Sequence, residues 1–376
     1  MTGGIFGPFM DGRLEPVAAK VLAGERLSFE DGVVVSTTED LLGVGRLANH
    51  VRERLHGDAT YFNVNRHLNP TNVCVASCKL CAFAEKYGGE RGWTYTVEEA
   101  VEVAARDVTE AVTELHVVGG LHPKLGVEYY EALFTALKRR FPWIHVKALT
   151  MVELDFLAQR AKLPVPEVVR RLVAAGLDSC PGGGAEIFAE RVRREICDHK
   201  TSGERWLEVA RQVHELGVRT NCTMLYGHIE TPEERVDHLI RLRELQDATG
   251  GFQCFIPLAF HPANTRLDHI PPATGRFDLQ VIAVSRLMLD SIPHIKAYWI
   301  QLGAKAAQTA LHFGADDVDG TVVDERIFLA AGGRAGRGMT RARLEHLIRE
   351  ASRVPVERDS LYNRRSAADS ADAVGY

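Results

Sequence analysis

Three absences from this 376-residue sequence each remove a class of protein. No apolar run approaches the roughly 20 residues that a helix needs to cross a bilayer, so we expect no membrane anchor. The first 16 residues contain no basic region followed by an apolar run, so we expect no signal peptide. The net charge of −5 and the dispersed basic residues give no nucleic-acid-binding face. We therefore expect a soluble, cytoplasmic protein.

Cysteine is scarce, with seven residues, but three of them lie within one eight-residue stretch. Cys74, Cys78 and Cys81 are separated by three and by two residues, so their thiolates can all reach one small metal centre. The odd total and the absent signal peptide argue against disulfides. The remaining cysteines have no ligand-like spacing and are expected to be buried small hydrophobes: 180, 197, 222 and 254.

The number of thiols narrows the kind of metal site. A closed structural zinc site takes four ligands, and a simple ferredoxin-type cluster likewise takes four cysteines. Three thiolates on a four-iron cluster would leave one iron open, as a metal that binds a substrate requires. Two other interpretations of the loop stay open at this point: a structural zinc completed by a histidine such as His67, and no metal at all.

From about residue 59, short apolar runs alternate with longer stretches of helical periodicity. The capping-box sequences Thr96–Glu99 and Thr231–Glu234 mark the start of two of these helices. Such alternation predicts a parallel sheet covered by helices, and eight units favour an α/β fold of the TIM-type (β/α)8 barrel. The expected strands are residues 61–64, 114–118, 145–149, 177–180, 219–225, 252–257, 295–300 and, more weakly, 314–318.

We divide the chain into four parts. Residues 1–57 form a helical segment that packs on the barrel, and residues 58–320 form the barrel itself. Residues 321–365 form a C-terminal extension with one helix near 340–353, and residues 366–376 read as a disordered tail. A glycine- and arginine-rich stretch at 332–338 precedes that helix and is expected to be a mobile loop.

The active site of a barrel lies on the loops that follow the C-terminal ends of its strands, and the three-cysteine loop follows the first expected strand. Gly119 and Gly120 follow the second strand and allow a ligand to approach the backbone closely. Three glycines and then Glu186 follow the fourth strand, where they are suited to a ribose or a carboxylate. Polar side chains also follow the fifth and sixth strands: Tyr226, His228, His261, Asn264 and Thr265. The acidic loop 316–319 is expected to bind ribose or water rather than a metal.

The spacing Cys-x3-Cys-x2-Cys at the start of a barrel resembles the signature of the radical S-adenosylmethionine enzymes. Within them, the combined pattern of several stretches resembles the aminofutalosine synthase family over about residues 40–365. Two related families share much of the pattern, the dehypoxanthine futalosine cyclases and the deazaflavin (coenzyme F420) synthase components. The stretch Leu258–Phe260 favours the synthases. The matching stretches are residues 69–74, 119–123, 181–186, 256–262 and 314–320.

The resemblance implies a [4Fe–4S] cluster on the three cysteines, with S-adenosylmethionine bound at the open iron and consumed as a co-substrate. It implies that a 5′-deoxyadenosyl radical adds to 3-[(1-carboxyvinyl)oxy]benzoate and gives 6-amino-6-deoxyfutalosine for menaquinone biosynthesis. It also implies a one-electron donor of the flavodoxin or ferredoxin type, and it assigns no catalytic side chain.

The same resemblance implies binding roles for individual residues. Gly119, Gly120 and Glu186 would contact S-adenosylmethionine. The residue before the third cysteine, usually aromatic in the family, is Leu80 here, so adenine stacking is either weaker or falls to Phe83. Tyr226, His228, His261, Asn264 and Thr265 are the expected substrate-binding residues. Two interpretations from other classes stay open: a non-catalytic iron–sulfur electron-transfer or sensor protein, and a zinc-stabilised barrel.

Overall fold

The computed structural model describes residues 6–333 and 338–365. The expected disordered tail, and residues 334–337 of the glycine- and arginine-rich stretch, lie outside the described residues.

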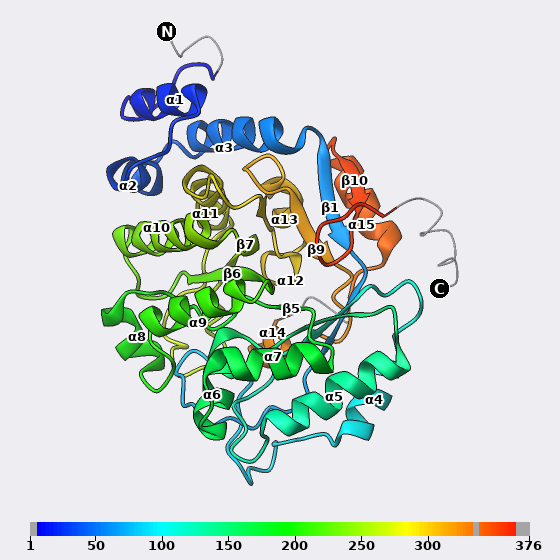
Figure 1. The fold of residues 1–376 in the computed structure, drawn as a ribbon. Coiled ribbons are helices and arrows are strands. Elements are labelled where there is room, and N and C mark those ends of the chain that lie inside the picture. The colour runs from blue at the N-terminus through cyan, green and yellow to red at the C-terminus, as the bar shows by residue number, and fades with distance from the viewer. Residues whose placement is uncertain (1–5, 334–337, 366–376) are drawn as a thin grey trace.

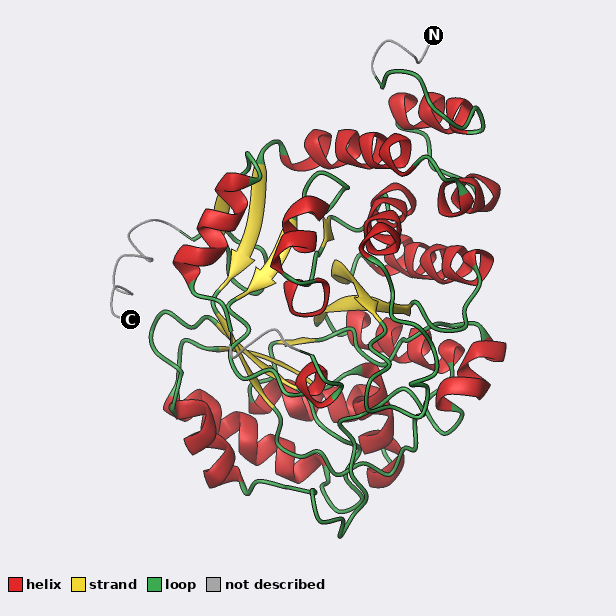
Figure 2. Ribbon diagram, turned by 180° about the vertical axis from the view of Figure 1, so that it is seen from behind, coloured by secondary structure: helices red, strands yellow, loops and turns green. Residues whose placement is uncertain are grey.

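The centre of the fold is a curved sheet of seven parallel strands that lie side by side in chain order. Figure 2 shows these strands inside and the helices around them. Because each strand is followed by helices that return the chain to the starting edge, all strand pairs run parallel. The expected TIM-type α/β barrel is therefore confirmed. The strands are β2 (Asn65–Leu68), β3 (Glu114–Val117), β4 (His145–Ala148), β5 (Ser179–Cys180), β6 (Arg219–Tyr226), β7 (Phe252–Ala259) and β8 (His294–Ile295).

Helices on the outside of the sheet bury one apolar face each, and their starts follow from the sequence. Both expected capping boxes are present, because Thr96 and Glu99, and likewise Thr231 and Glu234, bond each other's backbone amides. A third capping box joins Thr150 to Glu153. The helices are α4 (Val97–Ala105), α5 (Val127–Arg140), α6 (Met151–Ala161), α7 (Val165–Ala175), α8 (Glu190–Cys197), α9 (Gly203–Glu215), α10 (Pro232–Thr249) and α11 (Gly275–Met288).

The first and seventh expected strands differ from those in the structure. The strand that pairs with β3 is β2, whereas β1 (Ala59–Asn63) joins β10 (Val354–Glu357) and β9 (Asp317–Gly320) in a second sheet of three strands. The chain passes from β1 to β2 at Val64. At the start of β2, the side-chain oxygen of Asn65 accepts a hydrogen bond of 2.7 Å from the amide of Val322. The seventh strand is shorter than expected, since helix α12 (Trp299–Leu302) begins within the predicted range.

The segment 316–323 closes the barrel. On one side the amide of Ala297 donates to the carbonyl of Asp317 at 2.7 Å, next to β8. On the other side the amide of His67, in β2, donates to the carbonyl of Val323 at 2.9 Å. This segment therefore bonds to both edges of the seven-stranded sheet, which is the position that a (β/α)8 barrel gives to its eighth strand.

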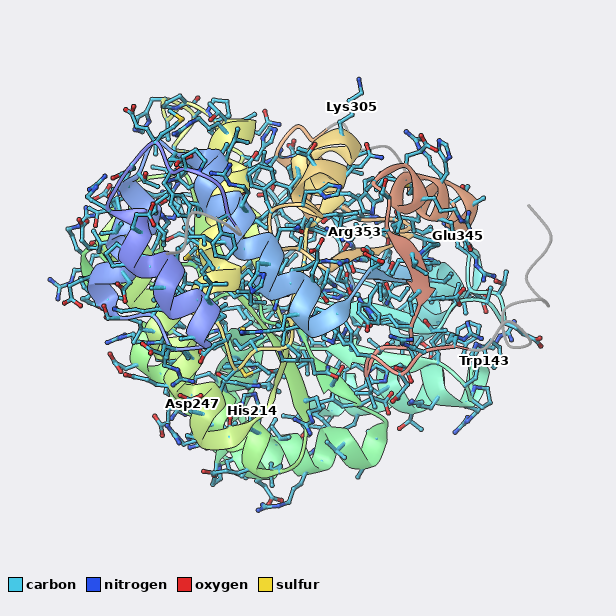
Figure 3. All side chains as sticks on the ribbon, turned by 90° about the horizontal axis from the view of Figure 1, so that it is seen from above. Trp143, His214, Asp247, Lys305, Glu345 and Arg353 are labelled. Carbon is cyan, nitrogen blue, oxygen red and sulfur yellow. The ribbon has the colours of Figure 1, made fainter. Side chains whose placement is uncertain are left out.

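Segments from both the N-terminal and the C-terminal part of the chain pack on the barrel (Figure 1). Helices α1 (Leu14–Ala23), α2 (Phe29–Thr37) and α3 (Leu41–His56) come first, and α2 and α3 contact α10 and α11. Arg353, labelled in Figure 3, donates at 2.8 Å to Glu53 and thereby joins the segment after α15 (Arg341–Glu350) to α3. Among the described residues, no helix is long and apolar enough to span a membrane. The remaining short helices are α13 (Ala304–Ala310) and α14 (Ile327–Ala330).

Candidate active site

A cavity of about 360 Å³ opens at the carboxyl ends of the barrel strands and extends into the barrel. All three cysteines of the loop after β2 line it, as do Gly119 and Gly120 after β3. The loops after β5 and β7 complete its wall. The expected cluster ligands and the expected glycine pair therefore lie at one site, as the position of active sites at the carboxyl ends of barrel strands predicts.

The cysteine loop is held by hydrogen bonds to segments far away in the sequence. The amide of Cys74 donates to the carbonyl of Glu85 at 2.8 Å, and the amide of Val75 donates to Leu121 at 3.0 Å. Further along, the amide of Lys79 donates to the carbonyl of Ile196 at 2.8 Å. Because the backbone of the loop is fixed on several sides, its thiols are arranged before any metal arrives.

The spacing of the three sulfur atoms separates a cluster from a single zinc ion. Two thiolates on one zinc lie at most about 4.6 Å apart, because each Zn–S bond is about 2.3 Å. Among the described residues, the one group of three potential ligands whose atoms all lie within 4.8 Å of one another is His56, His294 and Asp316. The three cysteine sulfurs do not form such a group, and a cluster spreads its thiolate ligands over several irons.

Two electrostatic effects on the thiols act in opposite directions. Burial raises the pKa of the Cys74, Cys78 and Cys81 thiols, while the ammonium of Lys200 acts in the opposite direction. Thiolates in such surroundings are stabilised when they coordinate a metal, which removes the cost of the buried charge.

The glycine pair after β3 is required by the close approach of the cysteine loop. A Cβ atom on Gly120 would lie 2.2 Å from the carbonyl oxygen of Val73 and 3.0 Å from the Cβ of Cys74. The amide of Gly119 donates at 3.0 Å to the carboxylate of Glu153, whose pKa is raised by burial. Glu153 lines the cavity and was missed at the sequence level, although its capping box with Thr150 directly follows β4.

Glu186 lines the cavity and pairs with a buried ammonium. Its Oε1 accepts a hydrogen bond of 2.5 Å from Lys200. Burial alone would raise the pKa of Glu186, but the charge of Lys200 lowers it overall. Among the preceding glycines, Gly182 passes so close to β6 that a Cβ would lie 2.5 Å from the Cα of Cys222. The loop after β5 therefore presents an ionised carboxylate to the cavity.

Two more of the predicted residues, both with rings, lie at the cavity wall. Phe83 packs edge-to-face on Trp93 with ring centroids 5.5 Å apart. His261 packs edge-to-face on Phe328 at 5.1 Å, and its Nδ1 atom is buried without a hydrogen-bond partner.

The two residues expected after β6 are directed elsewhere. Tyr226 is fully buried, does not line the cavity, and donates a hydrogen bond of 2.7 Å to Asp278 in α11. The ring of His228 lies 3.0 Å from Glu230, within its own loop, and is also absent from the cavity wall. Internal partners hold both side chains in this structure, and their contact with substrate stays a prediction.

The two polar residues expected after His261 are likewise outside the cavity wall. Asn264 donates at 3.0 Å to the carbonyl of Ala330, and the hydroxyl of Thr265 donates at 2.7 Å to the carbonyl of Pro262. Both side chains stabilise loop backbone, which is a common use of these residue types in turns.

Two acids of the loop 316–319 form hydrogen bonds with other side chains of the protein. Asp316 accepts hydrogen bonds from Arg286 and His294, and Asp317 accepts one of 2.7 Å from Arg358. The expectation that this loop binds ribose or water is corrected for these two acids, which are fully buried.

The inner end of the cavity carries polar residues, most of which were not predicted as part of the site. They come from the inward-facing positions of several strands. The only available signal was the presence of charged residues and histidines within short strands. They are His67, Glu114, His116, Lys147, Asn221, Lys296 and Asp319.

Comparison with known protein families agrees with this geometry. Residues 68–242 match the radical SAM superfamily, and residues 249–371 match the CofH/MqnC C-terminal region. The chain is similar to solved structures of the FeFe-hydrogenase maturase HydG from Carboxydothermus hydrogenoformans and of methylornithine synthase. The match to HydG has a TM-score of 0.72 at 16% identity and covers 93% of this chain and 80% of HydG. The match to methylornithine synthase has a TM-score of 0.70 at 16% identity and covers 90% of this chain and 96% of that protein.

Curated relatives match over nearly the whole chain. An aminodeoxyfutalosine synthase from Thermus thermophilus is 49% identical over 96% of this chain and 99% of its own length. Another aminodeoxyfutalosine synthase, from Streptomyces coelicolor, is 46% identical over 91% of this chain and 92% of its own length. A cyclic dehypoxanthine futalosine synthase from Streptomyces coelicolor is 39% identical over 93% and 88%. The chain therefore belongs to the radical SAM superfamily, whose members use a [4Fe–4S] cluster and S-adenosylmethionine, and to its branch with a CofH/MqnC C-terminal region.

Proposed function

We propose that this chain is an aminodeoxyfutalosine synthase. It transfers the 5′-deoxyadenosyl group of S-adenosylmethionine to 3-[(1-carboxyvinyl)oxy]benzoate and forms 6-amino-6-deoxyfutalosine. The observation that carries the proposal is the identity of 49% with a synthase of that name over 96% of this chain, against 39% with the cyclic dehypoxanthine futalosine synthase. The match covers the C-terminal region as well as the barrel, so it goes beyond a superfamily resemblance.

The residues at the cavity mouth fit the cofactor and the co-substrate. Cys74, Cys78 and Cys81 would hold a [4Fe–4S] cluster that, with S-adenosylmethionine bound, supplies a 5′-deoxyadenosyl radical. Glu186 uses one carboxylate oxygen for Lys200, and its other oxygen is suited to a ribose hydroxyl. Phe83 lies at the cavity wall, where its ring is available to the adenine.

The middle of the cavity suits a benzene ring. Its wall there is apolar and comes from the loop after β3 and from strands β6 and β7, with Val118, Leu225, Ile256, Leu258 and Phe260 as lining residues. An apolar wall binds the ring and excludes water from a reactive radical, while close positioning favours addition to the vinyl carbon over side reactions. Aryl migration, loss of one carboxylate as CO2 and return of the electron that cleaved S-adenosylmethionine would then complete the conversion.

The proposed electron donor is a flavodoxin or ferredoxin, and the proposed location is the cytoplasm. The cysteine loop supports a protein donor because part of it reaches the surface, with Val75 52% exposed. The seven free thiols of the chain suit a reducing compartment.

The decisive experiment uses the anaerobically reconstituted enzyme with S-adenosylmethionine, a strong reductant and 3-[(1-carboxyvinyl)oxy]benzoate. Mass spectrometry of the products is expected to show aminodeoxyfutalosine together with methionine. Formation of 5′-deoxyadenosine alone would instead indicate hydrogen abstraction, as in the cyclase. Neither product from a protein with a full cluster would favour a non-catalytic iron–sulfur protein.

A pair of cysteine variants tests the cluster ligands. Cys78→Ala is expected to abolish both iron binding and product formation, because two thiolates do not hold the cluster. Cys197→Ala is the matched control, since Cys197 is buried in α8 and does not line the cavity. Iron and sulfide analysis of both proteins provides the measurement. Full activity in Cys78→Ala, or zinc without iron in the wild type, would contradict the assignment.

A further inference from the structure

Two buried polar side chains at the inner end of the cavity have atoms without a hydrogen-bond partner among the residues that the structure describes. They are Nε2 of His67 in β2 and Oδ1 of Asn221 in β6, and the two residues are 7% and 3% exposed. Both residues line the cavity. Buried polar atoms are nearly always paired in native proteins, so unpartnered ones that face a cavity indicate a polar ligand.

His67 belongs to a row of side chains at one level of the barrel. It pairs in register with His116 on β3, and His116 pairs in register with Lys147 on β4. The two imidazoles stack with ring centroids 4.5 Å apart and planes 12° apart. Burial lowers the pKa of both histidines, and that of His67 to about 4, so the stacked rings are neutral at pH 7. Each neutral ring still carries one N–H donor.

Two lysines add donors to the same end of the cavity. Lys147 bonds Glu114 at 2.6 Å, and Lys296 bonds Asp319 at 2.8 Å. An ammonium group has three N–H donors, and the structure pairs only one on each of these lysines with a protein acceptor. The inner end of the cavity therefore offers several N–H groups to an incoming acceptor, and all four members of the two ion pairs line it.

We propose that His67, His116, Lys147 and Lys296, here called the floor subsite, bind the carboxylate on the benzene ring of the substrate. This inference rests on the proposed function. The vinyl ether must lie next to the 5′-carbon of the S-adenosylmethionine that the cavity mouth would hold. His116 precedes Gly119 by three residues, about 10 Å along a strand, which is comparable to the length of a benzoate with one short substituent. The remote carboxylate thus reaches the floor, and the benzene ring lies against the apolar wall between the two ends.

The subsite provides hydrogen bonds for the ring carboxylate that the apolar wall does not provide. A carboxylate placed against the apolar wall would lose its hydration without new hydrogen bonds, whereas the floor replaces them. Entry with the ring carboxylate first places the vinyl carbon at the mouth. His67 is accordingly a substrate-binding residue that determines specificity, and it takes no part in the radical chemistry.

The test varies the protein and the substrate together. His67→Phe keeps the stacked ring and removes the N–H group, while His67→Gln retains an N–H donor. The second substrate is 2-phenoxyacrylate, which lacks the ring carboxylate. His67→Phe is expected to raise both Kd and KM for the dicarboxylate about tenfold or more, and to change KM for 2-phenoxyacrylate little. His67→Gln is expected to recover part of the loss.

Two controls separate this inference from the proposed function. Iron content and S-adenosylmethionine binding should be unchanged in His67→Phe, and His199→Phe, at an exposed position, should behave as the wild type. The floor subsite alone would be overturned if the wild type converts the dicarboxylate and His67→Phe has the same Kd and KM for it as the wild type. Equal losses with both substrates would also overturn it. A wild type that neither binds nor converts the dicarboxylate would overturn the proposed function and the subsite together.

Discussion

The Nζ atom of Lys200 lies 2.5 Å from Oε1 of Glu186, although Glu186 precedes helix α8 and Lys200 follows it. Glu186 has a left-handed backbone with φ of 47°, which directs the carboxylate of this loop residue toward the cavity. The ammonium of Lys200 also acts on the pKa of all three cluster cysteines. One buried cation therefore serves both the proposed ribose contact and the thiolate ligands.

Replacing this cation is expected to damage stability and binding together. Lys200→Met leaves Glu186 buried without its partner, which costs about 3 kcal/mol when such a pair is broken. The pKa of Glu186 is lowered in the folded protein, so the contribution of the pair is present at neutral pH and is lost as the pH falls below 4.5. Denaturant unfolding at pH 7.5 measures the loss of stability, and equilibrium binding measures a weaker affinity for S-adenosylmethionine.

Two further variants test this explanation. Lys305→Met removes an exposed lysine (Figure 3) that does not line the cavity, and it is expected to match the wild type. Lys200→Met combined with Glu186→Gln removes both charges and should recover much of the lost stability, because no uncompensated charge remains. A single variant as stable as the wild type would show that the pair contributes nothing.

Gly120→Ala is expected to displace the cysteine loop. The added methyl group would overlap the carbonyl oxygen of Val73, and both contacting groups belong to backbone that cannot move independently. We expect lower iron content after reconstitution and at least a hundredfold loss of product formation, the scale of loss that a 1 Å misplacement of a reacting group causes. Gly275→Ala at the start of α11 is the control, since its added Cβ would meet nothing within 4 Å. Normal iron content in Gly120→Ala would contradict the proposed role.

The barrel mouth was predictable from sequence because it follows from general rules. Alternating strands and helices predict a parallel barrel, and the strand-end rule then places Cys74 and Gly120 at one site. The inner end of the cavity was not predictable in the same way. Strands β2, β3 and β4 are each four residues long, which is too short for their pattern to tell which polar residues face inward.

Tyr226 illustrates the same limit within a longer strand. Alternate residues of β6 line the cavity, namely Asn221, Thr223 and Leu225, so the side chain of Tyr226 must face the helices instead. We expected the strand to end at residue 225, which placed Tyr226 in the following loop. The structure extends the strand through Tyr226, and this one-residue difference reverses the direction of the side chain.

Tyr226→Phe should consequently affect stability rather than substrate binding. The hydroxyl of Tyr226 bonds Asp278 at 2.7 Å in a buried contact, and its loss leaves the Asp278 carboxyl without that donor. We expect the free energy of unfolding to fall by about 1–2 kcal/mol. KM for the substrate should stay within about twofold of the wild type. A large rise in KM without a change in stability would restore Tyr226 to the substrate site.

Acid sensitivity is expected from His238, which is fully buried in α10. Its Nε2 donates at 2.9 Å to the carbonyl of Thr223, and its Nδ1 accepts from the amide of Phe188 at 3.2 Å. Both ring nitrogens are therefore used by the neutral form, and burial lowers the pKa of His238 to about 3. In the unfolded chain the imidazole takes up a proton below pH 6.5, whereas the folded protein does not until about pH 3.

It follows that the contribution of His238 to stability is complete above pH 6.5 and declines as the pH falls toward 3. Between pH 8 and pH 5 this one group should lower the free energy of unfolding by about 2 kcal/mol. His238→Gln is expected to be less stable at pH 8, yet to lose about 2 kcal/mol less than the wild type on acidification. His199→Gln, at an exposed site, should lose as much as the wild type. Anaerobic denaturant titrations at the two pH values measure this difference, and an equal loss in His238→Gln and wild type would show that His238 is not held neutral.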